Sequence, residues 1–237
     1  MVKVLLFLIL SVQMFGQSAY LINRRTASRP PPAAGGASYI ISENFEGTGI
    51  PTGWGTGTGT PDYDYTTSPM EGAQGLRLDA SSADQSSVSP TNTAAAEVWI
   101  YYRLRVDVLP ASSREAVRLR NAGTSIARVF ITTSGQMQFR HGTVSVSTVG
   151  VMAPATDYHC WLHYLAGSGA NGVADWGFST DGTEPTSGNN FGSTASGDAT
   201  GSIDNFQFFA DFASATGPIQ VFDKFRYDDA DIGSNPD

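Results

Sequence analysis

The sequence predicts an all-β protein whose body is a sandwich of two antiparallel sheets, and three observations support this. Short segments rich in β-branched and aromatic residues follow one another from residue 39 to residue 233, with Gly, Ser, Asn or Pro between them. No segment of this body has the apolar period of an amphipathic helix. No unit recurs at a fixed spacing, which disfavours a propeller or a β-helix. Strands without intervening helices favour antiparallel pairing in a sandwich.

The first 19 residues have the layout of a secretory signal peptide. Lys3 precedes an apolar run from Val4 to Leu10, and the small residues Gly16 and Ala19 follow. The apolar run is shorter than the roughly 20 residues of a membrane-spanning helix, so no span is expected. The same segment could instead be retained as a hydrophobic arm that docks onto a neighbouring subunit, and both interpretations stay open.

The rest of the chain divides into a linker, one domain and a short tail. Residues 20–38 contain three arginines, three consecutive prolines and an Ala-Ala-Gly-Gly stretch, which predicts an extended tether. Residues 39–233 form the predicted sandwich and residues 234–237 the tail. A sandwich of this length commonly forms a single domain.

The expected elements follow in order. A first strand covers 38–45, and a Gly-rich loop held by Trp54 covers 46–61. A short strand at 75–80 and a polar, loop-like stretch at 83–95 lead into a long strand. The later strands are expected at 115–120, 125–132, 136–141, 144–149, 157–166, 172–179, 202–212 and 219–227.

The long strand, Glu97 to Pro110, alternates apolar and polar residues with a period of two, which indicates burial on one face only. The expected inner face carries Val98, Ile100, Tyr102, Leu104, Val106 and Val108, and the expected outer face Trp99, Tyr101, Arg103, Arg105 and Asp107. The opposite assignment of the two faces remains an alternative.

Composition restricts the partners. The formal net charge is −8 and the isoelectric point about 4.7, which opposes nonspecific binding to nucleic acid or to an anionic membrane surface. Of the 14 basic residues only Lys3 and Lys224 are lysines, so arginine, which suits planar and bidentate contacts, dominates. The single cysteine, Cys160, excludes an intramolecular disulfide.

The arginines and aromatic residues of the outer face are the candidate ligand-binding residues. Arg118, Arg120 and Arg226 take the outward parity of two other strands. If those strands neighbour the long one, the candidates form one band: Trp99, Tyr101, Arg103, Arg105, Arg118, Arg120 and Arg226. Aromatic rings stack on sugar faces and guanidinium groups bind carboxylates and hydroxyls, but the same residues also suit a protein interface. Cross-strand pairing with acids is the structural alternative.

Three separated motifs resemble one family. They are N-F-E-G-T-G-I-P-T-G-W at Asn44–Trp54, the pair E-V-W-I-Y-Y-R-L-R-V and A-V-R-L-R, and F-D-K-F-R-Y-D-D-A-D-I-G at Phe222–Gly233. In this order they resemble the laminin-G-like, concanavalin A-like jelly rolls of secreted bacterial proteins and phage virions. The resemblance covers about residues 39–233. It implies two stacked antiparallel sheets with an outer face for binding, and it implies no activity.

Catalytic motifs give no positive signal. Laminarinase-like glycoside hydrolases of this fold carry Glu-x-Asp-x-x-Glu on one strand, and no glutamate here begins that motif. His159 and His163, beside Cys160, are expected on the polar side of a strand and not as a zinc pair. Gly167 to Gly172 matches G-x-G-x-x-G, but a strand-like segment follows where a helix is required, so a hairpin loop is expected.

One metal site remains a candidate. Glu46, Asp62, Asp64 and Asp223 would supply oxygen ligands for calcium if the first loop and the last strand meet, as in some related jelly rolls. Solvated acids are the alternative, and no other cofactor is indicated.

The sequence therefore predicts a non-catalytic module, secreted or exposed on a cell or virion surface, that binds a glycan through a sheet face or rim loops and serves adhesion. The alternative is a structural virion or surface-lattice protein whose N-terminal arm docks onto neighbouring subunits, with a homo-oligomer as one outcome. A glycoside hydrolase is the third candidate. No enzyme activity is expected.

Overall fold

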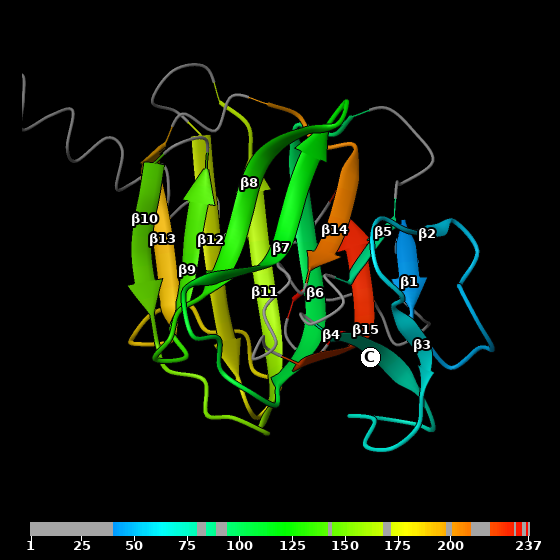
Figure 1. The fold of residues 1–237 in the computed structure, drawn as a ribbon. Helices are drawn as coiled ribbons and strands as arrows, with labels where there is room; N and C mark the ends of the chain where they lie inside the picture. Colours follow the sequence, from blue (N-terminus) through cyan, green and yellow to red (C-terminus); the bar gives the residue numbers. More distant parts are fainter. Residues whose placement is uncertain are drawn as a thin grey trace, which may run out of the picture. The chain divides into compact units, whose positions relative to one another are not determined.

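A computed structural model describes residues 40–79, 84–88, 94–141, 144–167, 172–197, 201–209, 219–229, 231–233 and 236. These residues form fifteen strands and no helix, arranged as two stacked antiparallel sheets (Figure 1). The predicted fold class is confirmed. No membrane-spanning helix occurs among the described residues. The expected leader at 1–19 and linker at 20–38 lie outside them, as does the expected tail apart from residue 236.

One sheet has eight strands and the other seven. The eight-stranded sheet has the order β13-β12-β11-β6-β15-β4-β3, with β1 also paired to β15. Its strands are β1 Ile41–Glu43, β3 Asp62–Tyr65, β4 Gly75–Asp79, β6 Glu97–Val106, β11 Asp157–Leu165, β12 Gly172–Ser179, β13 Phe191–Gly197 and β15 Ile219–Asp228.

The seven-stranded sheet covers one face of the eight-stranded sheet (Figure 1) and has the order β10-β9-β8-β7-β14-β5-β2. Its strands are β2 Trp54–Thr56, β5 Gln85–Val88, β7 Arg114–Asn121, β8 Thr124–Ile131, β9 Met137–His141, β10 Val144–Val149 and β14 Asn205–Phe209.

Four strands form in segments without a strand signal in the sequence. The strands β2 and β3 lie in the stretch expected as a Gly-rich loop or just after it, β5 lies in the stretch expected as polar loop, and β13 follows a Gly- and Asn-containing turn. Three of the four are short, and β2, β3 and β13 are edge strands of their sheets. Pairing with a neighbouring strand supplies the backbone hydrogen bonds, so strong local propensity is not required.

The alternation on β6 settles which face is inside. Val98, Ile100 and Leu104 are at most 1% exposed and belong to the core between the sheets. Trp99, Tyr101, Arg103 and Arg105 therefore lie on the outer face of the eight-stranded sheet, as predicted.

Aromatic rings fill the centre of the core. Phe208 on β14 lies 4.0 Å from Phe222 on β15 between ring centroids, and it stacks on Trp54 at 5.9 Å with an interplanar angle of 10°. Phe225 contacts Trp54 edge-on at 5.4 Å. These rings come from both sheets, so they hold the two layers together. Trp54 is 8% exposed and anchors its loop, as expected.

Phe208→Ala is predicted to lower the free energy of unfolding by about 3–5 kcal/mol, because the ring is fully buried and touches aromatic residues of both sheets. Urea unfolding followed by tryptophan fluorescence measures this loss. Val151→Ala serves as the control, since Val151 is 62% exposed and should change stability by less than about 0.5 kcal/mol. Equal effects of the two substitutions would contradict this account of the core.

Candidate active site

Three neighbouring strands of the eight-stranded sheet, β11, β6 and β15, place polar and ionisable residues side by side on its outer face. In the register, Arg103 of β6 is opposite His159 of β11 on one side and Asp223 of β15 on the other. Outward residues of adjacent strands lie about 5 Å apart, so one short row brings a guanidinium, an imidazole and a carboxylate together.

A β-bulge in β15 adds a lysine to this row. Asp223 is opposite Arg103 and Arg226 is opposite Tyr101, so β15 contains one residue more than β6 over the same distance. Lys224 is a non-glycine residue with a φ of 43°, in the left-handed region. Phe222 and Phe225 both stay in the core, while the ammonium group of Lys224 reaches the outer face.

The carboxylate of Glu71 lies between two cations. One of its oxygens is 2.7 Å from Nη1 of Arg103, and the other is 2.7 Å from Nζ of Lys224. Glu71 comes from the loop between β3 and β4, and its side chain is 46% exposed, whereas the Arg103 side chain is 12% exposed. The two cations therefore form a small site that holds one carboxylate at the surface.

Asp223 fixes the base of this loop. Its Oδ2 accepts a hydrogen bond from the amide of Glu71 at 2.9 Å, and its Oδ1 accepts one from the amide of Lys224 at 2.8 Å. Burial raises the pKa of Asp223 to about 7, although these amides and Arg103 offset part of the effect and the nearby Glu46 adds to it.

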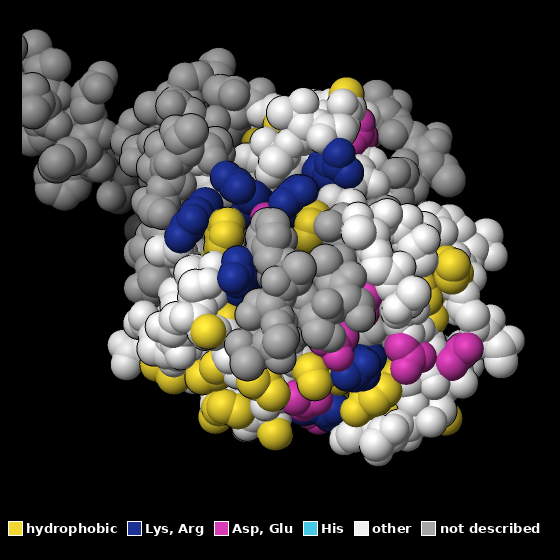
Figure 2. All heavy atoms as spheres, viewed as in Figure 1, with side chains coloured by type: hydrophobic (Ala, Val, Ile, Leu, Met, Phe, Trp, Pro, Cys, Tyr) yellow, Lys and Arg dark blue, Asp and Glu magenta, His cyan; other side chains and the backbone are white. Residues whose placement is uncertain are grey.

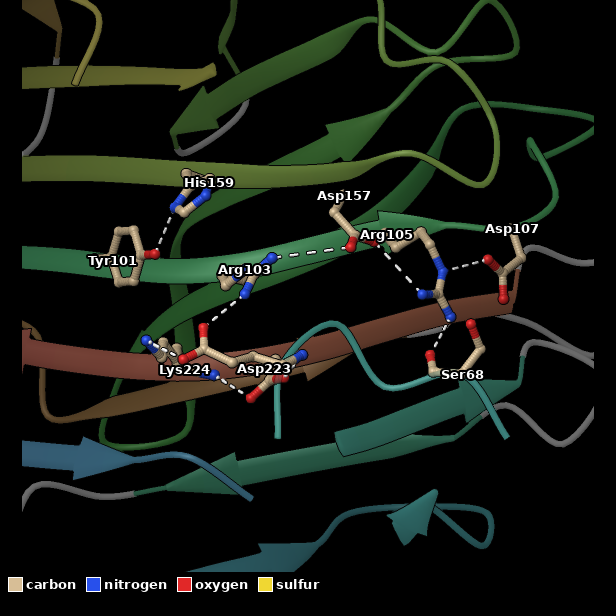
Figure 3. A network of polar contacts seen from close by, with 10 residues as sticks. Ser68, Tyr101, Arg103, Arg105, Asp107, Asp157, His159, Asp223 and Lys224 are labelled. Atoms are coloured by element: carbon tan, nitrogen blue, oxygen red, sulfur yellow. Dashed lines mark hydrogen bonds and ion pairs between the residues drawn. The ribbon is translucent and has the colours of Figure 1, made fainter. Parts of the chain in front are cut away.

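Tyr101 and His159 form a hydrogen-bonded pair beside the cations (Figure 3). The hydroxyl oxygen of Tyr101 is 2.7 Å from Nδ1 of His159. Tyr101 is fully buried, because Trp161 and Ile232 cover it, and the indole of Trp161 donates a hydrogen bond to the carbonyl of Gly233. His159 is only partly buried. The tyrosine therefore orients an imidazole that solvent can reach.

Arg105, one of the predicted ligand-binding residues, connects β6 to the β3–β4 loop (Figure 3). Its guanidinium donates to Oδ1 of Asp107 at 2.7 Å, to Oδ1 of Asp157 at 3.5 Å and to the carbonyl of Ser68 at 2.6 Å. Burial lowers its pKa, but the bond to Asp107 and the charges of Asp107 and Asp157 outweigh burial, so the pKa is raised. Arg105 thus ties the β3–β4 loop to β6.

Trp99 packs flat on a histidine. Its ring lies 3.8 Å from that of His163 at an interplanar angle of 11°, and the imidazole bonds to Glu97 at 3.1 Å and Asp175 at 3.4 Å. Burial lowers the pKa of His163, but the hydrogen bonds to Asp175 and Glu97 outweigh burial and raise it. A small pocket beside this stack is lined by Trp99, Trp161, His163, Asp175, Glu184, Phe191 and Ile232, among others.

The predicted band of seven residues is not one surface, and this expectation is wrong for Arg118 and Arg120. Both belong to β7, in the seven-stranded sheet, and so lie on the opposite side of the sandwich. Arg226 is in the expected sheet but is 5% exposed, with its guanidinium donating to the carbonyl of Glu43 and the side chain of Asn44. It fastens β1 to β15.

The four calcium candidates divide into two pairs. Glu46 and Asp223 both hold the β3–β4 loop, with the Glu46 carboxylate accepting the amide of Ala73 at 2.9 Å. A Cβ at Gly72, whose φ is 62°, would collide with that carboxylate. Asp62 and Asp64 lie on β3, where Asp64 accepts the amide of Gly49 at 2.6 Å. The described residues contain no cluster of three or more metal-binding side chains, and calcium stays a prediction.

Sequence reasoning missed Lys224, Glu71 and His159 as members of one site. A signal for Lys224 was present, because Phe222 and Phe225 are three apart and cannot both face the core in a regular strand. His159 was expected on the polar side of its strand, and it lies there. Nothing in the local sequence of Glu71 indicates the loop conformation that brings it to the cations.

Comparisons with known proteins agree on the fold. No family model matches the chain, and no curated protein matches its sequence. An endo-β-1,4-glucuronan lyase from Trichoderma reesei is 14% identical, with a TM-score of 0.57 over 84% of this chain and 99% of the lyase. The cellulose-induced protein Cip1 is 14% identical, with a TM-score of 0.58 over 81% and 99%. A PL-14 alginate lyase from Aplysia kurodai is 8% identical, with a TM-score of 0.52 over 81% and 99%.

These likenesses place the chain in the β-sandwich, jelly-roll class, and the finer assignment to laminin-G-like or concanavalin A-like proteins stays a prediction. They also overturn the expectation of a non-catalytic glycan-binding or virion module that is not an enzyme, because two of the structures that share this fold over nearly their whole length are polysaccharide lyases. Identities of 8–14% carry the fold alone, so the activity has to be argued from the site.

The buried Asp223 should make stability depend on pH in a defined window. Between its ordinary pKa of 3.8 and about 7, the folded protein holds a proton on Asp223 that the unfolded chain has released. The contribution of Asp223 is therefore fully present below pH 4 and is lost as the pH rises to 7. Relative to Asp223→Asn, the wild-type melting temperature should fall across this window and then stay level. Parallel pH profiles of the two proteins would contradict the raised pKa.

Proposed function

We propose that this protein is a polysaccharide lyase that cleaves a uronic-acid-containing polysaccharide by β-elimination on the outer face of its eight-stranded sheet. The observation that carries the proposal is the carboxylate of Glu71, held 2.7 Å from both Arg103 and Lys224. A site that holds a protein carboxylate in this way also suits the carboxylate of a sugar acid. The likeness to a glucuronan lyase and an alginate lyase supports the same substrate class.

The two cations supply the first requirement of the reaction. β-Elimination begins with removal of the proton on C5, next to the sugar carboxylate, and negative charge then develops on that carboxylate. With Arg103 and Lys224 on its oxygens, this charge is stabilised by two cations, which makes the C5 proton more acidic. Arg103 and Lys224 therefore neutralise the substrate carboxylate.

His159 supplies the base. In the tautomer whose Nδ1–H donates to the Tyr101 oxygen, Nε2 carries a lone pair, and this nitrogen accepts the C5 proton. The electron pair of the C5–H bond forms the C4=C5 double bond while the C4–O4 bond breaks. The departing O4 takes the proton that the imidazolium holds. His159 ends neutral, the chain is cut, and the new non-reducing end is an unsaturated uronate.

The predicted N-terminal leader is consistent with a substrate outside the cell. The leader at 1–19 predicts secretion, which would bring the enzyme to polysaccharides outside the cell. Secretion and the cleavage of the leader stay predictions, since these residues lie outside the described part of the chain.

His159→Ala is predicted to lower kcat on alginate, polygalacturonate or polyglucuronate by about 10²–10⁴, because the proton acceptor is removed. The measurement is the ultraviolet absorbance of the C4=C5 double bond conjugated with the carboxylate. His163→Ala is the matched control, since His163 lies on the same strand and face but packs on Trp99 away from the cations. Absence of unsaturated product from the wild type on all uronate polymers, or full activity of His159→Ala, would refute the proposal.

Glu71→Gln is predicted to lower KM for the polymer roughly two- to fivefold, because the substrate carboxylate no longer has to displace a competing surface ion pair. Glu46→Gln is the control, since Glu46 holds the same loop through the amide of Ala73. Steady-state kinetics on one polymer measure both variants. A KM that rises in Glu71→Gln, or falls equally in both variants, would show that Glu71 does not compete with substrate.

A further inference from the structure

Charge is divided unequally between the two sheets. The strands of the seven-stranded sheet contain five arginines, no lysine and a single acidic residue, Glu115. The strands of the eight-stranded sheet contain nine acidic and five basic residues. In a protein with a net charge of −8, the seven-stranded sheet is therefore locally cationic.

Three of these arginines form a row across adjacent strands. Arg118 of β7 is directly opposite Arg128 of β8, and Arg128 is directly opposite Arg140 of β9. Like charges directly opposite one another in a sheet repel each other, and Glu115 pairs with Arg118 at one end of the row. In Figure 2, dark blue side chains gather on the face that these strands form. A row of partly exposed guanidinium groups suits an anionic ligand.

Two phenylalanine rings fix the guanidinium groups. Arg118 lies over the ring of Phe209, with 4.0 Å from Cζ to the ring centroid, and Arg140 lies over the ring of Phe130 at 4.0 Å. Glu115 binds the Nε and Nη2 of Arg118, at 2.5 and 2.7 Å. The planes of these groups are thus set before any ligand arrives, which lowers the entropic cost of binding.

Arg120 extends the row toward one end of β7. Its Nη1 donates to the side chain of Gln207 at 3.3 Å, and its Nη2 donates to the carbonyl of Gly123 at 2.6 Å. Gln207 is itself the β14 partner of Arg118 in the register. The arginines of this surface therefore come from three neighbouring strands, β7, β8 and β9.

We propose that the outer face of the seven-stranded sheet, at Arg118, Arg120, Arg128 and Arg140, is a second binding surface that holds an anionic polysaccharide away from the active site. The identity of the polymer, the same uronate chain that the other sheet cleaves, rests on the proposed function. A repeating anion fits the repeat of charges across the strands, about 4.8 Å apart. Single-stranded nucleic acid is the less suitable polyanion, because Phe130 and Phe209 are 7% and 1% exposed and offer no ring for base stacking.

The surface would also compensate for a repulsion. An enzyme with a net charge of −8 repels a polyanionic substrate at long range. A cationic face that binds the polymer raises its local concentration at the catalytic face of the same molecule. The predicted consequence is that losing this surface affects long substrates and leaves short ones unaffected.

The test compares Arg128→Gln/Arg140→Gln with Arg24→Gln/Arg25→Gln, which removes the same two charges outside the described part of the chain. Affinity electrophoresis in gels containing alginate measures binding, with hydroxyethylcellulose as the uncharged control and single-stranded DNA as the competing polyanion. The sheet variant should bind alginate at least about fivefold more weakly than wild type, and the control variant should match wild type. The melting temperatures of both variants, compared with that of wild type, separate a loss of binding from a loss of folding.

Kinetics separate this inference from the proposed function. In the sheet variant, KM for alginate should rise while kcat and KM for a uronate trisaccharide stay at wild-type values. Unchanged alginate binding in an active enzyme would overturn the second surface and leave the proposed function standing. Arginine-dependent binding without unsaturated product would support the surface and refute the lyase. Arginine-dependent binding that is as tight for DNA as for alginate would overturn the polysaccharide assignment.

Discussion

The candidate site depends on one irregularity, the extra residue in β15. A regular strand would send alternate residues to alternate faces, so Phe222 and Phe225 could not both enter the core. The bulge at Lys224 resolves this conflict by inserting one residue in the left-handed region. The backbone strain of this residue is offset by the burial of both phenylalanine rings in the core. The result is that Asp223 and Lys224 both serve the outer face, next to Arg103.

The loop between β3 and β4 connects the electrostatics of this site. Two carboxylates hold its backbone, Asp223 at Glu71 and Glu46 at Ala73, and Arg105 holds the carbonyl of Ser68. Held in this way, the loop places the carboxylate of Glu71 against Arg103 and Lys224. Loop position, the protonation of Asp223 and occupancy of the cation pair are therefore linked through direct hydrogen bonds, and a change in one changes the free energy of the others.

The sequence was sufficient for the class of fold and for the faces of β6, because both follow from a local period of two. Which sheet a strand joins does not follow from its local sequence. Arg118 and Arg103 share the same outward parity, yet β7 joins the sheet opposite β6, and only long-range pairing decides this. The absence of a Glu-x-Asp-x-x-Glu motif excludes one kind of glycosidase and does not exclude enzymes in general. The proposed site takes its cations and its base from three strands, and no linear motif records such a set.

The two sheets arrange their basic residues differently on the two outer faces of the sandwich. The face proposed to be catalytic carries more acids than bases in its strands, so its cations have to be concentrated at one point, where Glu71 already neutralises part of their charge. The opposite face has almost no acids and spreads its arginines across several strands. A single carboxylate is best bound by the first arrangement and a run of carboxylates by the second, because focused charge favours one ion and repeated charge favours a chain. In the proposed function, the division of charge between the sheets corresponds to a division between cutting a polymer and holding it.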